Sequence, residues 1–207
     1  MKKTKVKICG ITNLEDAIVA VGAGCDALGF IFYKKSPRFI SPLAARKIIR
    51  LLPKRIIKIG IFVDASLKSI KSIARSCKLD ILQFHGNESA EFCKKFKGFR
   101  IIKAFHVKNK INPRDLKKYD VFAYLFDTFS SSKLGGTGKQ FNWSWISDVN
   151  RVGKPVFLSG GLNEINVGKA IRSVHPQWVD ASSSLEASPG KKDKIKVIRF
   201  IKKAKQH

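Results

Sequence analysis

A cysteine near the start of the chain is the first residue whose type and place suit chemistry. In the stretch VKICGITN the branched residues Val6 and Ile8 alternate with more reactive ones. The period of two of a strand places Lys7 and Cys9 together on the opposite face. A glycine follows at once and allows a sharp turn, so Cys9 lies at the carboxyl end of a strand, where parallel α/β proteins bind ligands. The thiol is either functional or one more buried cysteine.

Later strand ends repeat this placement of chemically capable side chains. For any one of them alone, a solvated loop residue or a satisfied buried polar group is the favoured explanation. If the strands form a parallel barrel, however, all of them meet at one mouth. The side chains concerned are Cys9, Arg38, Gln83, His85, Asp127, Ser159, Gly160, Asp180 and Ser182.

Two glycine- and serine-rich segments suit the binding of phosphate. FLSGGLN at 157–163 ends a predicted strand and opens a helix, so the backbone amides of Gly160 and Gly161 can approach an anion. DASSSLEASPG at 180–190 follows the next strand and offers further amides and hydroxyls. In barrels, the loops after the seventh and eighth strands commonly bind phosphate.

A longer segment, SSSKLGGTGKQFNW, follows Asp127. It is rich in serine, glycine and lysine, and is either a plain flexible loop or a lid that folds over a bound substrate. We expect a lid.

Eight strands alternating with eight helices are predicted to position these residues, as a single-domain α/β (β/α)8 TIM barrel over residues 1–207. Apolar runs recur about every 25 residues. An open doubly wound sheet is the alternative. The predicted strands are 5–9, 27–32, 56–63, 81–86, 100–107, 121–127, 155–159 and 178–182. The predicted helices are 14–22, 41–52, 66–76, 88–96, 113–118, 143–149, 163–173 and 192–204.

Composition narrows the class of protein. With 207 residues, 44% of them hydrophobic, the chain can bury a sizeable core. No apolar run is long enough to span a membrane, and the basic start leads into a polar turn, so we expect a cytoplasmic protein with no membrane partner. The four cysteines form no CxxC pair, which argues against a disulfide framework or a zinc site.

The net charge is unusual, because 41 lysines and arginines face 15 acidic residues, a formal charge of +26. Such a balance raises the possibility of an anionic partner such as nucleic acid. The lysines are spread along predicted helix faces, however, with no aromatic-interleaved patch and no basic tail. We therefore expect an enzyme with an anionic small-molecule substrate, and no nucleic-acid partner.

Six motifs, in order along the chain, resemble the phosphoribosylanthranilate isomerase family of tryptophan biosynthesis. The resemblance spans the whole chain and implies the (β/α)8 barrel. The motifs are VKICGIT, GFIFYKKSPRFIS, LQFHG, FDT with GGTGKQFNW, LSGGLN and DASSSLEASPGKKD.

The resemblance implies an intramolecular aldose–ketose isomerisation, the Amadori rearrangement of N-(5-phosphoribosyl)anthranilate to 1-(2-carboxyphenylamino)-1-deoxyribulose 5-phosphate. It gives Asp127 the role of general acid and Cys9 that of general base, with no cofactor and no metal. Such an acid must be kept protonated by burial or by negative charge, whereas the thiol must be partly ionised. Lys7, on the same strand face as Cys9, is our candidate for the positive charge that ionises the thiol.

The resemblance also implies which residues bind the substrate, a phosphorylated small molecule, because their positions match those of the family motifs. The resemblance places Arg38 against the anthranilate carboxylate, a task suited to a two-pronged donor. It gives polar contacts to His85 and Asp180, and the phosphate to Gly160, Gly161, Ser183 and Ser184. It leaves the choice between monomer and homodimer open.

One position departs from the family pattern. Ser184 stands where a glycine is usual, and Ala181 where valine is common. If position 184 needs a positive φ, serine costs about 1 kcal/mol or more and tilts the phosphate-binding amide. If it is an ordinary helix start, the hydroxyl is harmless or helpful.

Two other functions compete with the isomerase. A related phosphosugar barrel, such as indole-3-glycerol-phosphate synthase or a sugar isomerase with two aspartates, would share the phosphate loops but does not account for Cys9 paired with Asp127. A basic nucleic-acid-binding barrel without catalysis is suggested only by the charge, and predicts strongly salt-dependent binding.

Overall fold

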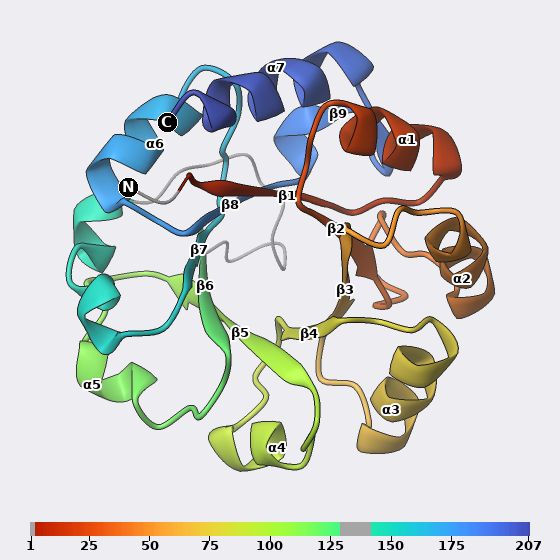
Figure 1. The fold of residues 1–207 in the computed structure, drawn as a ribbon. Helices are drawn as coiled ribbons and strands as arrows, with labels where there is room; N and C mark the ends of the chain where they lie inside the picture. The colour runs from red at the N-terminus through yellow and green to blue at the C-terminus, as the bar shows by residue number, and fades with distance from the viewer. Residues whose placement is uncertain (1–2, 129–141) are drawn as a thin grey trace.

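The strands close into a barrel in the computed structural model, which describes residues 3–128 and 142–207 (Figure 1). All neighbours are parallel, and β1 pairs with both β2 and β8, which excludes the open sheet. The fold class predicted from the sequence is therefore confirmed. The strands are β1 (Lys5–Cys9), β2 (Ala27–Ile31), β3 (Ile57–Phe62), β4 (Ile81–Phe84), β5 (Arg100–Val107), β6 (Ala123–Thr128), β7 (Val156–Leu158) and β8 (Trp178–Ala181).

Helices surround the barrel on the outside (Figure 1). Several begin where the sequence predicts, because a serine or asparagine caps the first turn: Ser41 and Ser66 accept the backbone N–H groups of Ala44 and Ser69. The helices are α1 (Leu14–Gly22), α2 (Pro42–Arg50), α3 (Leu67–Ser76), α4 (Ala90–Lys94), α5 (Pro113–Leu116), α6 (Val167–Val174) and α7 (Lys194–Lys205).

Two apolar layers hold the barrel together. Val6 and Ile8 point outward into the layer between strands and helices. An inner layer fills the barrel, and Cys9 packs there beside residues such as Ile59 and Phe157. The alternation along β1 is therefore as predicted, with Lys7 and Cys9 inside.

The sequence prediction was wrong in two places. The helix expected over 143–149 is instead two 3-10 helices, η1 (Trp143–Ile146) and η2 (Val149–Val152), in a segment rich in residues of low helix propensity. The helix expected from Asn163 begins only at Val167. The first residues of the predicted helix form a turn instead, because the Asn163 side chain accepts the N–H groups of Ile165 and Asn166.

The connection between β8 and α7 also contains structure that the sequence did not predict. It holds the short 3-10 helix η3 (Ser183–Leu185) and a two-stranded hairpin of β9 (Glu186–Ser188) and β10 (Lys191–Lys192). This hairpin brings charged side chains to the carboxyl end of β1. Among the residues that the structure describes, no helix is long and apolar enough to cross a membrane.

Candidate active site

A cleft opens at the carboxyl ends of the strands and contains every site residue that the sequence predicted. Loops from opposite sides of the barrel contribute to it, so residues far apart in the chain converge there as the barrel prediction requires. The predicted residues that line it are Cys9, Arg38, His85, Asp127, Gly160, Gly161, Asp180, Ser183 and Ser184. The expected lid falls largely on residues 129–141, outside the described residues.

Cys9 lies at the inner wall of this cleft and is only 7% exposed. The absence of a side chain at Gly29 makes room for it, since a Cβ there would lie 2.9 Å from the Cys9 Sγ. Burial raises the pKa of the Cys9 thiol, although the charges of Lys7 and Lys192 act to lower it. The free protein therefore favours the thiol, and the expected positive charge of Lys7 is present without being dominant.

Lys7 is fully buried beneath the cleft and joins three strands. Its Nζ donates to Asp180 Oδ2 at 2.6 Å and to Gln83 Oε1 at 2.9 Å. Burial by itself would lower the pKa of Lys7, but the charge of Asp180, together with that of Cys9 when it is ionised, outweighs burial and raises the pKa. Lys7 is therefore a charged ammonium. The second oxygen of Asp180, Oδ1, is buried and has no hydrogen-bond partner within residues 3–128 and 142–207.

Asp127 lies across the cleft at the end of β6. Its Oδ2 is 3.3 Å from His85 Nε2, and its Oδ1 accepts the N–H of Thr128 at 2.8 Å. Burial acts to raise the pKa of Asp127, but the hydrogen bond from His85 and the charges that His85 and His106 carry when protonated lower it below its usual range. The environment of the free protein is thus the opposite of the one expected for a general acid.

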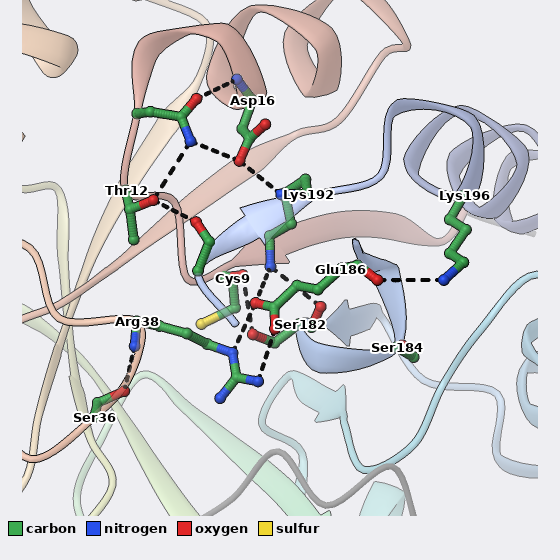
Figure 2. Close-up of polar contacts among 12 residues, drawn as sticks. Cys9, Thr12, Asp16, Ser36, Arg38, Ser182, Ser184, Glu186, Lys192 and Lys196 are labelled. Atoms are coloured by element: carbon green, nitrogen blue, oxygen red, sulfur yellow. Dashed lines mark hydrogen bonds and ion pairs between the residues drawn. The ribbon is translucent and has the colours of Figure 1, made fainter. Parts of the chain in front are cut away.

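Arg38 enters the cleft from the loop after β2 and meets the hairpin (Figure 2). Its Nε and Nη2 donate to the two carboxylate oxygens of Glu186 at 2.7 and 2.8 Å. Lys192, which is buried, donates to the same carboxylate and to the Ser182 carbonyl, each at 3.1 Å. The guanidinium is therefore held in a fixed orientation, which suits a group that must recognise a planar anion.

The glycine cradle has the backbone that an anion site needs. Gly160 and Gly161 have φ values of 91° and 65°, which glycine adopts without steric cost. A Cβ on Gly160 would lie 2.7 Å from the backbone nitrogen of Thr128. The loop therefore approaches the end of β6 so closely that only glycine fits.

Ser184 resolves the question that the sequence left open. Within η3 it does not have a positive φ. Its hydroxyl donates to the carbonyl of Leu162 and so ties the loop after β8 to the loop after β7. Strain at this position does not arise.

A family model described as N-(5'phosphoribosyl)anthranilate (PRA) isomerase matches residues 6–203 of the chain. The match covers every strand end at the cleft. The chain belongs to the phosphoribosylanthranilate isomerase family.

Members of the isomerase family resemble the chain over its whole length. An N-(5'-phosphoribosyl)anthranilate isomerase of Geotalea uraniireducens is 50% identical over 202 residues, 98% of each chain. The crystal structure of the Thermotoga maritima isomerase is 42% identical, covers 99% of this chain and 100% of its own, and superimposes with a TM-score of 0.90. A further crystal structure, with a TM-score of 0.86 and 41% identity over 99% of this chain and 100% of its own, is a complex with a reduced 1-(o-carboxyphenylamino)-1-deoxyribulose 5-phosphate.

Three residues at or beside the cleft were not predicted from the sequence: Glu186, Lys192 and His106. Glu186 and Lys192 belong to the hairpin, which no pattern in the sequence indicated. His106 lies on β5 beside Asp127 in the strand register, and its ring is 5.0 Å from that of His85. Its position near the end of a predicted strand was the available signal.

Ligand atoms of His85, His106 and Asp127 lie within 4.8 Å of one another, a spacing that a metal site also has. Both ring nitrogens of His85 already take part in hydrogen bonds, to Gln83 and to Asp127. His106 Nε2 contacts the His85 carbonyl at 3.3 Å. We therefore interpret the three as a hydrogen-bonded cluster and assign no metal to them.

Proposed function

We propose that this chain isomerises N-(5-phosphoribosyl)anthranilate, in the tryptophan pathway, with Cys9 as general base and Asp127 as general acid. The observation that carries the proposal is that these two groups face one cleft from opposite sides, between a fixed arginine and a glycine cradle. A substrate with a carboxylate at one end and a phosphate at the other fits this arrangement of charge.

Formation of the enolamine intermediate needs one proton delivered and one removed. Asp127 donates its proton to the ribose ring oxygen, the bond between that oxygen and C1′ breaks, and the nitrogen lone pair forms an iminium. The Cys9 thiolate then takes the proton from C2′, and the C–H electrons neutralise the iminium to give an enolamine. The enolamine becomes the ketone when O2′ loses its proton and C1′ gains one.

Three polar features support the proposed binding of the substrate. Arg38 uses Nε and Nη2 for Glu186, which leaves further N–H donors on the guanidinium for the anthranilate carboxylate. The unpartnered Asp180 Oδ1 would accept a ribose hydroxyl, which removes the cost of burying it unsatisfied. His85 lines the same cleft. The amides of Gly160, Gly161, Ser183 and Ser184 would hold the phosphate.

Substrate binding raises the pKa of Asp127, as the role of general acid requires. The substrate brings a carboxylate and a phosphate into a cleft where this carboxyl is already buried, and negative charge nearby raises the pKa of a carboxyl group. The same charges oppose ionisation of Cys9, which Lys7 and Lys192 favour. The thiolate therefore depends on these two lysines.

The partners we propose follow from the same features. Exposed lysines are spread over separate outer elements, with Lys68 on α3, Lys117 and Lys118 just after α5, and Lys202 and Lys203 on α7, which supports a small phosphorylated ligand and not a nucleic acid. The site is built from one chain, so a monomer and a homodimer are both compatible with activity, and light scattering decides between them. The relative from Thermotoga maritima is described as dimeric. All four cysteines are buried and unpaired, in keeping with a cytoplasmic enzyme.

Turnover of phosphoribosylanthranilate, generated in situ and followed by loss of its fluorescence, tests the assignment. We expect the native protein to be active, and Cys9→Ala and Asp127→Ala each to lose at least about a hundredfold in kcat, the effect of removing an acid or a base. Cys25→Ala is the matched control, because Cys25 is an equally buried thiol in the outer core. Its kcat should stay within about twofold of the native value.

Two results would contradict the proposal. An inactive native protein would remove the function, and a fully active Cys9→Ala variant would remove the role of the thiol. Salt-dependent binding of nucleic acid together with no turnover would favour the non-catalytic alternative.

A further inference from the structure

A continuous chain of side-chain contacts runs beneath the cleft from Lys7, on the same strand face as the proposed base, to the proposed acid Asp127. Lys7 Nζ donates to Gln83 Oε1 at 2.9 Å, and Gln83 Nε2 lies 2.8 Å from His85 Nδ1. His85 Nε2 in turn lies 3.3 Å from Asp127 Oδ2. The functional assignment gives a role to each end of this chain and a substrate contact to His85, but it gives no role to Gln83 and does not say which nitrogen of His85 carries the proton.

Lys7 determines which way the Gln83 amide faces. An ammonium group only donates hydrogen bonds, and Lys7 is charged because Asp180 is 2.6 Å from its Nζ. The amide oxygen must therefore point to Lys7, and the amide NH2 group to the imidazole. Gln83 is 1% exposed, so no water competes to turn it.

The Gln83 orientation in turn determines the state of His85. An amide NH2 group only donates, so His85 Nδ1 must accept and carries no hydrogen. The single proton of the neutral ring then lies on Nε2, which faces Asp127. A second proton on the ring would need Nδ1, where the Gln83 N–H already points.

We propose, on the basis of the function assigned above, that Lys7 and Gln83 hold His85 as the neutral Nε2–H tautomer, so that His85 orients the Asp127 carboxyl without accepting its proton. Lys7, Gln83 and His85 are positioning residues in this scheme. The ring presents an N–H and not a lone pair to the acid, so the proton of Asp127 is available to the substrate alone.

The neutral ring also limits the charge around the acid. An imidazolium at this position would lower the pKa of Asp127, whereas a neutral donor leaves only the hydrogen bond. Burial lowers the pKa of His106, which keeps that neighbour neutral too. The titratable and charged groups that face His85 are Asp127 from β6, His106 from β5, Asp180 from β8 and, through Gln83, Lys7 from β1.

Nitrogen NMR of the imidazole ring reports the tautomer and protonation of His85 directly. The protein has four histidines, so a long-range proton–nitrogen spectrum of histidine-labelled protein is simple, and the signals lost in His85→Asn identify His85. We expect the neutral Nε2–H pattern at pH 7. The Nδ1–H tautomer or an imidazolium at pH 7 in the native protein would overturn the proposal.

Gln83→Glu reverses the hydrogen bond at nearly constant shape. A carboxylate accepts from Nδ1–H, so His85 should be doubly protonated at pH 7 in this variant. Gln177→Glu makes the same change at the other end of the barrel, where the side-chain oxygen of this exposed residue accepts the N–H of Val156. This control should leave the His85 signals unchanged. An unaltered His85 spectrum in Gln83→Glu would also overturn the proposal.

Kinetics distinguish positioning from general support of the fold. In Gln83→Glu we expect kcat to fall about tenfold with KM within about threefold. The alkaline limb of the pH profile should also move to lower pH, because an acid of lowered pKa loses its proton earlier as pH rises. The NMR result does not depend on turnover, so an inactive native protein with the expected tautomer would remove the enzymatic role and leave the His85 assignment intact.

Discussion

The two ends of the barrel carry cavities of different character. At the carboxyl ends of the strands, charged and polar groups converge, and hydrogen bonds between them cross from one strand to another. At the amino ends the cavity is lined by apolar and aromatic side chains with basic ones at its edge. There Phe157 and Trp178 stack at 4.8 Å, and Lys5 lies over the Trp178 ring.

One face of β1 passes through both environments. Lys5 is exposed at the amino end, Lys7 is buried in the middle, and Cys9 opens into the cleft at the carboxyl end. The residue types of Lys5 and Lys7 are the same, yet one makes an exposed ring contact and the other a buried ion pair. The depth along a strand, and not the residue type, therefore separates a functional lysine from a surface one.

Removing each lysine charge in turn tests this contrast, and we expect the largest effect at Lys7. Lys7→Met leaves the Asp180 carboxylate buried without its partner, which costs about 3–5 kcal/mol of unfolding free energy. Lys5→Met loses at most about 1 kcal/mol, the size of an exposed cation–π contact. Denaturant unfolding of the two variants measures the difference. Equal losses would show that the network beneath the cleft adds no more than a surface contact.

Alanine substitutions at two glycines, one at each end of the barrel, should have a smaller effect on stability than Lys7→Met. Gly160, in the cradle, and Gly98, between α4 and β5, both have positive φ, at 91° and 86°. Alanine at either position therefore costs about 1 kcal/mol of backbone strain. Only at Gly160 would the new Cβ strike Thr128, whereas at Gly98 nothing lies within 4 Å.

Steady-state kinetics should separate these two alanine variants. We expect Gly160→Ala to raise KM for the phosphorylated substrate about tenfold or more, because the phosphate-binding amides shift. Gly98→Ala shares the backbone strain without the clash, and should keep KM within about twofold. An unchanged KM in Gly160→Ala would contradict the proposed phosphate site.

The fold and the place of the site could be predicted because they follow from local patterns. Apolar runs with period-two alternation determine the strands and their inward faces, and parallel strands bring all their carboxyl ends to one rim. Hence Cys9, His85 and Asp127 meet as expected. The Asn163 start failed because the same side chain that caps a helix also caps a turn.

The charge network could not be predicted, since it depends on contacts between distant strands. Lys7 and Asp180 are 173 residues apart in the chain, and only barrel closure brings them together. Whether Lys7 would ionise the thiol depended on how strongly burial opposes it, which the sequence does not give. The hairpin that holds Glu186 lies in a loop without any periodic pattern. Electrostatics at the site is therefore a product of the tertiary structure.

We expect the smallest effect on stability and activity from a substitution of Ser184. It removes a single hydroxyl at the carboxyl-end rim of the barrel. Ser184→Gly removes the hydrogen bond to the Leu162 carbonyl, which contributes about 0.5–1.5 kcal/mol, and adds chain entropy to the unfolded state. We expect a modest loss of thermal stability and a change in KM of less than about threefold, because the cradle amides stay in place. Ser173→Gly, at an exposed position in α6, is the matched control for the loss of a serine side chain. A large gain in activity in Ser184→Gly would show instead that serine hinders phosphate binding in this chain.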